Sequence, residues 1–107
     1  MINVMIFRDS TNQYKRFKVS GHAGYAEQGY DIVCSAVSTL TINTINSIEK
    51  FTDDKFSAYE EDGEVDFSFT NTVSKESKLL IDSMILGLTD IMESYGKKYL
   101  KISYKEV

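Results

Sequence analysis

The segment IVCSAVSTLTINTINSIEK, residues 32–50, decides the fold of this chain of 107 residues. Its apolar residues recur at the spacing of one helix face, and they are Val33, Val37, Leu40, Ile45 and Ile48. Asp31 directly precedes the segment, and its carboxylate is suited to accept hydrogen bonds from the backbone N–H groups of a first helical turn. We therefore predict a helix from Ile32 to about Lys50 with Asp31 as N-cap.

Upstream of this helix the sequence predicts a hairpin of two strands. Residues 2–7 are dense in Ile, Val, Met and Phe, and the turn formers of residues 9–12 follow them. Residues 14–20 then alternate between polar and apolar side chains. We expect Tyr14, Arg16 and Lys18 on one face of this strand, and Phe17 and Val19 on the other.

Downstream, a second hairpin, a second helix and a last strand are expected. Alternating residues at 56–58 and 65–69 flank Asp62-Gly63, a pair that suits a tight turn with positive φ. A helix should begin at Ser74 and end at Gly96, with Leu80, Met84, Leu88, Ile91 and Tyr95 at helical spacing. Leu100 to Tyr104 alternates as a final strand.

The resulting element order is ββαββαβ. We expect an α+β, two-layer fold in which two helices pack on one face of a five-stranded, largely antiparallel sheet. The length favours a single domain spanning residues 1–107.

The amino-acid composition limits the classes of molecule that this protein is expected to bind. Hydrophobic residues make up 42% of the chain, which is typical of a folded soluble protein. The 16 acidic and 12 basic residues give a net charge of -4, and no Lys/Arg cluster suits a nucleic-acid backbone. We expect no direct nucleic-acid binding, and an acidic surface that attracts basic partners, of which ribosomal proteins are one class.

The chain has one cysteine, so no disulfide within it is possible, and its first ten residues lack the pattern of a signal peptide. We expect a cytoplasmic protein. No stretch approaches the roughly 20 apolar residues of a membrane-spanning helix, so we expect no membrane span. Neither metal-ligand spacing nor a phosphate-binding glycine motif occurs, so we expect no metal and no cofactor.

Cys34 is the candidate nucleophile. It is the third residue of the predicted helix, where unpaired backbone N–H groups and the helix dipole favour a thiolate. His22 is the only histidine, and it lies twelve residues upstream across a glycine-rich segment that can fold back over the helix start. One cysteine and one histidine suffice for a catalytic dyad. The alternative is that Cys34 is a buried apolar residue and His22 a solvated surface group.

Two further side chains are candidates for supporting roles. Asp31 is suited to cap the helix, to orient His22, or to do both. Ser38 lies one turn after Cys34 on the same helical face, where it either donates a hydrogen bond into the site or bonds to its own helix backbone. The loop residues Gly21, Ala23, Gly24, Gly29 and Tyr30 are candidates for a segment that closes over a substrate.

Two other functions compete with catalysis by Cys34 and His22. A non-catalytic acidic binding module, acting as chaperone or assembly factor for a ribosomal protein, would leave Cys34 as a passive helix residue. A thiol redox sensor would use the same cysteine through a sulfenic acid, and it would require a thiol from a partner.

The chain also resembles a known family. Gly21-His22-Ala23, followed by Gly29-Tyr30-Asp31-Ile32-Val33-Cys34-Ser35-Ala36-Val37-Ser38, is similar to the signature of the ribosomal-processing cysteine proteases of the Prp family. The likeness extends over essentially the whole chain. Ser35 departs mildly from the alanine that is commonest in the family at that position.

The resemblance implies an endopeptidase that removes the short N-terminal extension of a large-subunit bacterial ribosomal protein. It makes Cys34 the nucleophile and His22 the general base, and it matches Asp31 and Ser38 to the family's acidic and serine positions. It also implies a homodimer and cleavage after an aromatic residue.

Overall fold

The computed structural model describes residues 1–21, 32–61 and 63–107. Five strands and two helices follow one another in the predicted order. Their bounds are β1 Ile2–Arg8, β2 Tyr14–Ser20, α1 Ile32–Phe51, β3 Phe56–Glu61, β4 Glu64–Phe69, α2 Lys75–Tyr95 and β5 Leu100–Glu106. Neither of these helices is long and apolar enough to cross a membrane.

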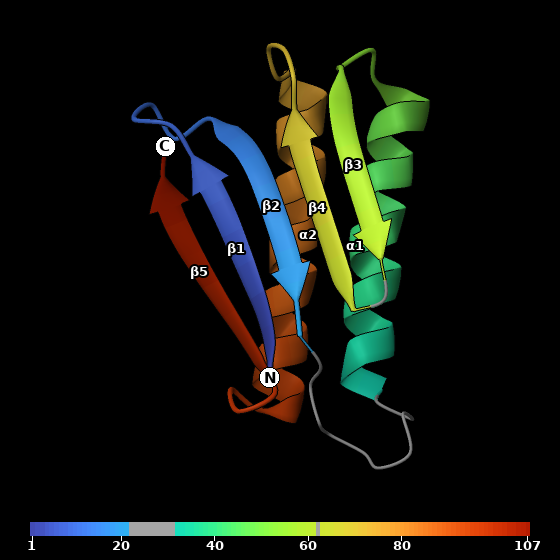
Figure 1. The fold of residues 1–107 in the computed structure, drawn as a ribbon, viewed down its shortest axis with the longest axis vertical. Coiled ribbons are helices and arrows are strands. Elements are labelled where there is room, and N and C mark those ends of the chain that lie inside the picture. Colours follow the sequence, from blue (N-terminus) through green and yellow to red (C-terminus); the bar gives the residue numbers. More distant parts are fainter. Residues whose placement is uncertain (22–31, 62) are drawn as a thin grey trace.

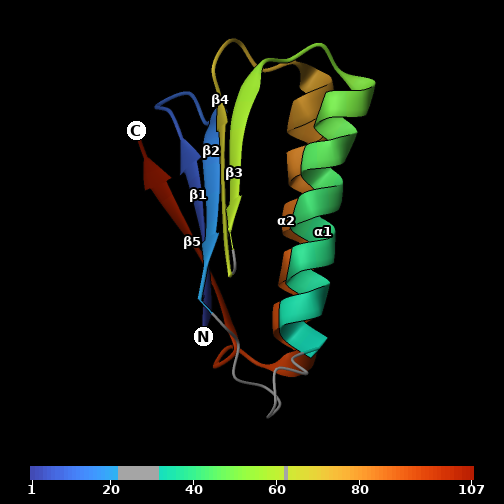
Figure 2. The same ribbon diagram turned by 45° about the vertical axis from the view of Figure 1, so that its right-hand side comes forward.

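The strands form one sheet in the order β3-β4-β2-β1-β5. β1 pairs in parallel with β5, and the other neighbours pair antiparallel. Both helices lie on the same face of this sheet, with α1 behind the β3 edge and α2 beside it (Figures 1 and 2). The predicted α+β fold with a mostly antiparallel sheet is therefore confirmed.

The core fills the space between the sheet and the two helices. Phe17 of β2 and Phe67 of β4 are fully buried and stack with ring centroids 5.0 Å apart. From the helices, α1 buries Val33, Val37 and Ile48, while α2 buries Ile81, Met84 and Leu88. Burial of apolar side chains from every layer is the main force that holds such a fold together.

The buried face of α1 differs in part from the predicted one. Thr41 and Thr44 are buried, whereas Leu40 is only half-buried. The Thr41 hydroxyl donates to the Val37 carbonyl oxygen at 2.9 Å, and the Thr44 hydroxyl donates to that of Leu40 at 2.8 Å. Because these bonds satisfy the hydroxyls within the helix, each threonine packs through its methyl group.

The prediction that Tyr14 shares a face with Arg16 and Lys18 is wrong. The register of β1 and β2 shifts between Phe7, opposite Arg16, and Arg8, opposite Tyr14. The resulting bulge turns Tyr14 towards the helices, where its hydroxyl donates to Asp82 of α2 at 2.5 Å. Burial, together with the neighbouring Asp82, raises the pKa of Tyr14.

The predicted start of α2 at Ser74 and its predicted C-terminal cap Gly96 are confirmed, and a third residue strengthens the start. Ser74 accepts a hydrogen bond from the backbone N–H of Ser77, and the Gly96 N–H donates to the Met92 carbonyl oxygen. The Asp54 carboxylate accepts from the Ser74 N–H at 3.0 Å, from the Ser74 hydroxyl at 2.6 Å and from the buried Ser77 hydroxyl. Asp54 thereby joins the end of the α1–β3 connection to the start of α2.

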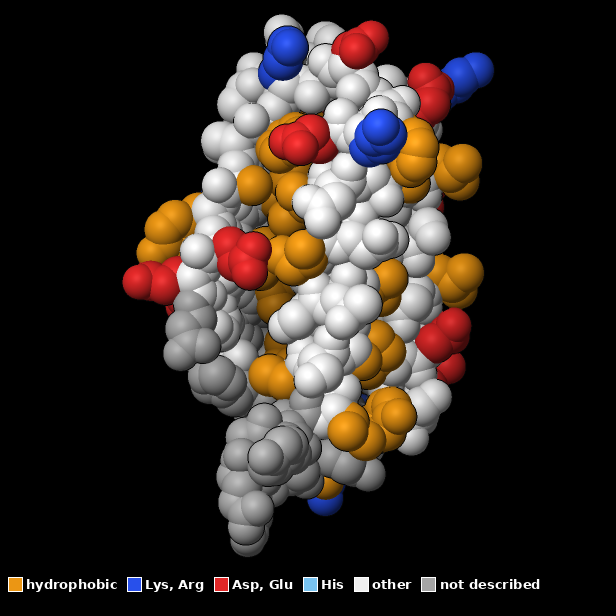
Figure 3. Space-filling view, turned by 90° about the vertical axis from the view of Figure 1, so that its right-hand side faces the viewer, with side chains coloured by type: hydrophobic (Ala, Val, Ile, Leu, Met, Phe, Trp, Pro, Cys, Tyr) orange, Lys and Arg blue, Asp and Glu red, His pale blue; other side chains and the backbone are white. Residues whose placement is uncertain are grey.

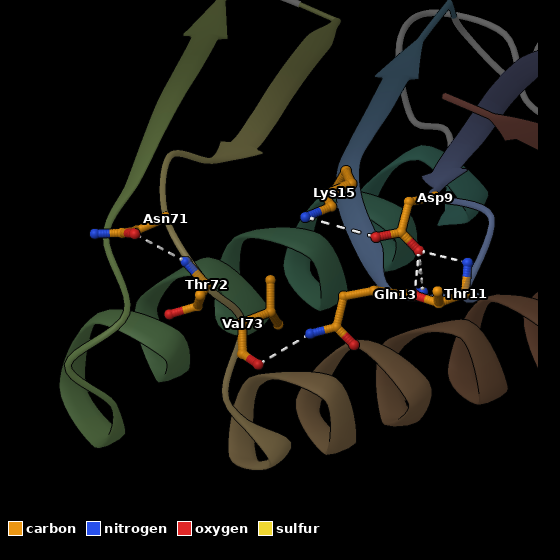
Figure 4. Close-up of polar contacts among 7 residues, drawn as sticks. All are labelled: Asp9, Thr11, Gln13, Lys15, Asn71, Thr72 and Val73. Carbon is orange, nitrogen blue, oxygen red and sulfur yellow. Dashed lines mark hydrogen bonds and ion pairs between the residues drawn. The ribbon is translucent and has the colours of Figure 1, made fainter.

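A similar contact holds the turn between β1 and β2. The Asp9 carboxylate accepts from the N–H and hydroxyl of Thr11, at 2.8 and 2.6 Å, and from the Gln13 N–H at 3.0 Å. The Gln13 side-chain amide donates to the Val73 carbonyl oxygen at 3.0 Å (Figure 4). This bond links the turn to the segment that leads into α2.

Of the two predicted turn residues between β3 and β4, Gly63 has a φ of 79°, as expected. Asp62 lies outside the described residues. Asp31, the predicted cap of α1, lies outside them as well, and α1 begins at Ile32 as expected.

Candidate active site

Helix α1 places Cys34 at its third residue, as the sequence predicts. The side chain is half-buried and packs partly against the core. The first turn of α1 contains no acidic residue, so no carboxylate within that turn opposes the positive end of the helix dipole. Cys34 lies at the positive end of the α1 dipole.

Cys34 and Ser38 line one wall of a pocket of about 400 Å³. This pocket opens between α1 and the β3–β4 hairpin, and its remaining described lining residues are Ile2, Val19, Gly21, Val37, Thr41, Ile42, Glu60, Glu61, Gly63, Glu64 and Val65. Figure 3 shows the furrow beside α1 with hydrophobic side chains along it and acidic side chains on its rim. The pocket is large enough for one or more side chains of a peptide.

The structure brings together three of the residues singled out from the sequence: Gly21, Cys34 and Ser38 all line this pocket. Ser38 is exposed, and it follows Cys34 by one helical turn. The other predicted site residues, His22, Ala23, Gly24, Gly29, Tyr30 and Asp31, lie outside the described residues.

Gly21 has a backbone conformation that favours glycine, with a φ of 89°. It ends the described part of the segment that contains the Gly-His-Ala motif, immediately before His22. Gly21 therefore lies in the same pocket as Cys34.

The glutamates of the β3–β4 hairpin are pocket residues that sequence reasoning missed. Glu60, Glu61 and Glu64 line the pocket at the end of the hairpin. Glu60 lies opposite the buried Val65, on the sheet face that bears the helices, whereas Glu61 and Glu64 lie opposite each other, on the face that Tyr59 shares. The Tyr59 hydroxyl donates to the Glu61 carboxylate, and this hydrogen bond raises the pKa of Tyr59. The acidic run from 60 to 64 is visible in the sequence, but only the tertiary pairing of β4 with β2 carries it to the cysteine.

Over residues 1–21, 32–61 and 63–107, no group of three or more His, Cys, Asp or Glu side chains has an arrangement that could hold a metal ion. The described lining of the pocket includes the thiol of Cys34, the hydroxyl of Ser38 and the glutamates of the β3–β4 hairpin. A thiolate at a helix start, with backbone N–H groups around it, is suited to attack a carbonyl carbon.

Residues 1–101 match the family described as "Cysteine protease Prp". The chain belongs to the Prp family of cysteine proteases. The family recognised from the Gly-His-Ala and Cys34 motifs is thus confirmed, and so is the prediction of a cysteine protease.

Two Prp proteins illustrate the likeness at the level of sequence. The ribosomal processing cysteine protease Prp of Staphylococcus aureus is 27% identical over 107 residues, covering 98% of this chain and all of the relative. The protein of the same name from Bacillus subtilis is 29% identical over 101 residues, covering 89% of this chain and 90% of the relative.

Solved structures of Prp extend the likeness to the fold. The S. aureus protease in complex with a covalently linked product peptide superposes with a TM-score of 0.90 at 27% identity, covering 98% of this chain and all of that one. The same protease with a substrate peptide gives a TM-score of 0.87 at 26% identity and the same coverage. The fold described here is therefore one on which the S. aureus protease binds peptides.

Proposed function

We propose that this protein is an endopeptidase that removes the short N-terminal extension of a large-subunit bacterial ribosomal protein, with Cys34 as nucleophile and His22 as general base. The observation that carries the proposal is Cys34 at the start of α1, in the wall of a pocket, in a chain of the Prp family. The substrate is proposed because the relatives from S. aureus and B. subtilis are named ribosomal processing proteases.

The proposal has three further parts. Residues 1–107 form a single protease domain, because one sheet and two helices share one hydrophobic core. The enzyme acts in the cytoplasm, where ribosomal proteins are made, and it works as a homodimer. No metal and no cofactor takes part in the reaction.

The mechanism is that of a thiol peptidase. His22 holds the proton of Cys34, and the thiolate attacks the scissile carbonyl carbon while backbone N–H groups at the start of α1 stabilise the oxyanion. The C–N bond then breaks, His22 protonates the leaving amine, and an acyl-enzyme remains. Water, activated by His22, hydrolyses the thioester and restores the thiol.

Other residues near the dyad have supporting roles in the proposal. Asp31 caps α1 and orients His22, and Ser38 donates a hydrogen bond into the site. The segment with Gly21, Ala23, Gly24, Gly29 and Tyr30 closes over the bound peptide and excludes water.

The decisive experiment incubates the purified protein with the unprocessed ribosomal protein of the same organism and measures the product masses. We expect a single cut near the N-terminus, which is absent with Cys34→Ala and with His22→Ala. Ser35→Ala is the matched control, because Ser35 is an exposed neighbour of Cys34 that lines a different groove of α1. Cleavage by Cys34→Ala would contradict the mechanism.

Binding without cleavage by the unaltered protein would favour the alternative of a chaperone or assembly factor. Family membership favours the enzyme over that alternative. The redox-sensor alternative predicts a mixed disulfide with a partner thiol under oxidant, and the same mass measurement detects it.

A further inference from the structure

The side of α1 that is turned away from the sheet has an unusual composition. From Ile32 to Ile48 the helix contains no charged residue, although 26% of the chain is charged. Its exposed side chains over this length include Thr39, Asn43 and Asn46, and Figure 3 shows the middle of α1 without red or blue side chains. The solvated face of a helix normally carries charged side chains, whereas the centre of a protein interface is depleted of them.

Helix α2 adds two leucines to the same side of the molecule. Leu79 and Leu86 are 68% and 65% exposed. They are separated by two helical turns, so both lie on one stripe of α2, with the exposed Ser83 between them. Met84 and Leu88, which α2 buries against the core, lie on the opposite side of the helix. The outward stripe of α2 is therefore apolar where solvent would favour charge.

The two helices meet closely enough to form one continuous surface. A Cβ atom on Gly87 of α2 would stand only 2.6 Å from a methyl carbon of Leu40 of α1. A shallow groove of about 570 Å³ follows this contact, and Thr39, Asn43 and Ile91 also line it. None of the described residues that line the groove is charged.

The area of this outer face meets the requirement of a dimer. α1 has 20 residues and α2 has 21, so each helix is about 30 Å long and, with its side chains, about 10 Å wide. Two neighbouring helices thus present about 600 Å², and a stable interface buries roughly 600–1,000 Å² on each partner. The face suffices when both helices take part, and a second copy of the chain offers a helix pair of matching length.

The stripe on α2 is complementary to itself when two copies meet with their helices antiparallel. A two-fold axis beside Ser83 places Leu79 against Leu86 of the second copy, and Leu86 against Leu79 of that copy, because the two leucines lie almost equally far from Ser83. The same axis brings the exposed Lys75 towards Asp90 of the second copy. The apolar centre is thus flanked by opposite charges, which favours this orientation.

Helix α1 fits the same axis. It runs antiparallel to α2 (Figure 1), and its Leu40 lies beside Gly87. Asn43, about one turn further along α1, therefore lies near the level of Ser83 and meets its own counterpart across the axis. An asparagine amide both donates and accepts hydrogen bonds, so two identical side chains can pair there.

We propose that two copies of the chain associate through the outer faces of α1 and α2, with Ser83 beside the two-fold axis and Leu79 against Leu86 of the second copy. The inference rests on the homodimer of the proposed function and adds the surface and register of contact. Cys34 and Ser38 line their pocket on the other flank of α1, so both pockets of the dimer stay open to peptide.

The first test is the molar mass of the purified protein in solution, measured by light scattering. At about 100 μM we expect twice the monomer mass of 12.2 kDa, because interfaces of standard area have dissociation constants in the micromolar range or below. A monomer at that concentration would overturn the proposal. The measurement needs no substrate, so a dimer without cleavage would count only against the proposed peptidase.

Two variants with the same change in net charge locate the interface. Leu79→Glu/Leu86→Glu should raise the dissociation constant of the dimer at least about 100-fold, because carboxylates then oppose one another at its centre. Both leucines are exposed, so the monomer should stay folded. The control, Tyr59→Glu/Val107→Glu, changes exposed residues outside the helix face and should keep the dimer. Equal weakening in both variants would overturn the proposal in favour of general charge repulsion.

A mixing experiment gives a gain instead of a loss. Leu79→Lys/Leu86→Lys should also be monomeric, because like charges oppose one another. An equal mixture with Leu79→Glu/Leu86→Glu should regain the dimer mass, since each introduced carboxylate then meets an introduced ammonium group. A mixture that stays monomeric would overturn the pairing of Leu79 with Leu86.

A disulfide tests the position of the axis. In a Cys34→Ala background, Ser83→Cys should link two copies under mild oxidation, because a residue beside a two-fold axis lies close to its counterpart. Ser57→Cys, which is exposed on β3 outside the helix face, should stay unlinked on non-reducing electrophoresis. A link through Ser57→Cys in place of Ser83→Cys would put the contact elsewhere and overturn the proposal.

Discussion

Gly21 and Met1 lie so close that a Cβ atom on Gly21 would stand 2.5 Å from the Met1 carbonyl oxygen. The contact is with a backbone atom of Met1, the residue before β1, so rotating a side chain cannot relieve it. The φ of 89° at Gly21 adds a second reason why only glycine fits.

We predict that Gly21→Ala destabilises the protein by about 1–3 kcal/mol, because alanine meets both the strained φ and the clash. Its kcat/KM should also decrease at temperatures where the variant is folded, since Gly21 adjoins His22 and lines the pocket. Gly96→Ala is the control, because its φ is 120° but its Cβ would meet only the Tyr99 ring at 3.6 Å. Denaturant unfolding should show a smaller loss for Gly96→Ala.

The position of Ser38 in the pocket predicts an effect on rate. If the Ser38 hydroxyl donates a hydrogen bond to a group that carries charge during the reaction, Ser38→Ala should lower kcat/KM roughly 10- to 100-fold. Stability should change by less than about 0.5 kcal/mol, because Ser38 is exposed. Steady-state kinetics beside Ser35→Ala provide the comparison, and equal rates for both variants would show that Ser38 has no role in turnover.

The two proposed roles of Asp31 predict different results for two substitutions. Asp31→Ser retains a good N-cap but removes the carboxylate, so stability should be kept while kcat/KM decreases. Asp31→Ala should lower both, with a loss of about 1 kcal/mol in the free energy of unfolding. Full activity of Asp31→Ser would show that Asp31 acts only as a helix cap.

Asp54 should make stability depend on pH. Burial opposes its charge, but the hydrogen bonds from Ser74 and Ser77 outweigh that effect and lower the pKa of Asp54. The stabilisation of the fold by Asp54 is therefore fully present above about 3.9, the pKa of an aspartate in the unfolded chain. It is lost as the pH falls through the lower pKa that Asp54 has in the folded protein. Asp54→Ala should cost about 1–3 kcal/mol at neutral pH.

The measurement for Asp54 is denaturant unfolding at several pH values. The difference between the unaltered protein and Asp54→Ala should shrink as the solution becomes more acidic. Asp53→Ala, an exposed neighbour, should change stability by less than about 0.5 kcal/mol at neutral pH. If Asp54→Ala lowers the free energy of unfolding by the same amount at every pH, the charge of Asp54 has no role in stability.

Tyr14 should make stability depend on pH in the opposite direction to Asp54. Its pKa is raised, so its contribution is complete below the unfolded value of about 10 and is lost as the pH rises through the native value. Tyr14→Phe should cost about 0.5–1.5 kcal/mol at neutral pH by removing the bond to Asp82. Tyr104→Phe is the control, since its exposed ring keeps its contact with Arg8. No cost for Tyr14→Phe would show that the bond between Tyr14 and Asp82 does not stabilise the fold.

Features set by neighbours in the chain could be predicted from the sequence. The element order followed from apolar periodicity, and the start of α2 at Ser74 and its cap Gly96 followed from residue types with strong local preferences. The same holds for Cys34, whose place at the third residue of α1 depends only on where that helix begins.

Features set by contacts between distant segments could not be predicted. Tyr14 faces inward because of a bulge in pairing with β1, and alternation alone cannot reveal a bulge. Asp54 contacts Ser77 across 23 positions of sequence. The glutamates of the β3–β4 hairpin reach the Cys34 pocket only through the order of strands in the sheet.

The parallel pairing of β1 with β5 has a practical consequence for experiments. It places residue 1 and residue 107 at opposite ends of the sheet (Figure 1), with the Val107 N–H bonded to the Arg8 carbonyl oxygen at 2.8 Å. An affinity tag or fluorescent protein fused before Met1 would start beside Gly21 and the pocket, where Ile2 is a lining residue. A fusion after Val107 starts at the far end, so it is the arrangement that leaves the path of a peptide to Cys34 clear.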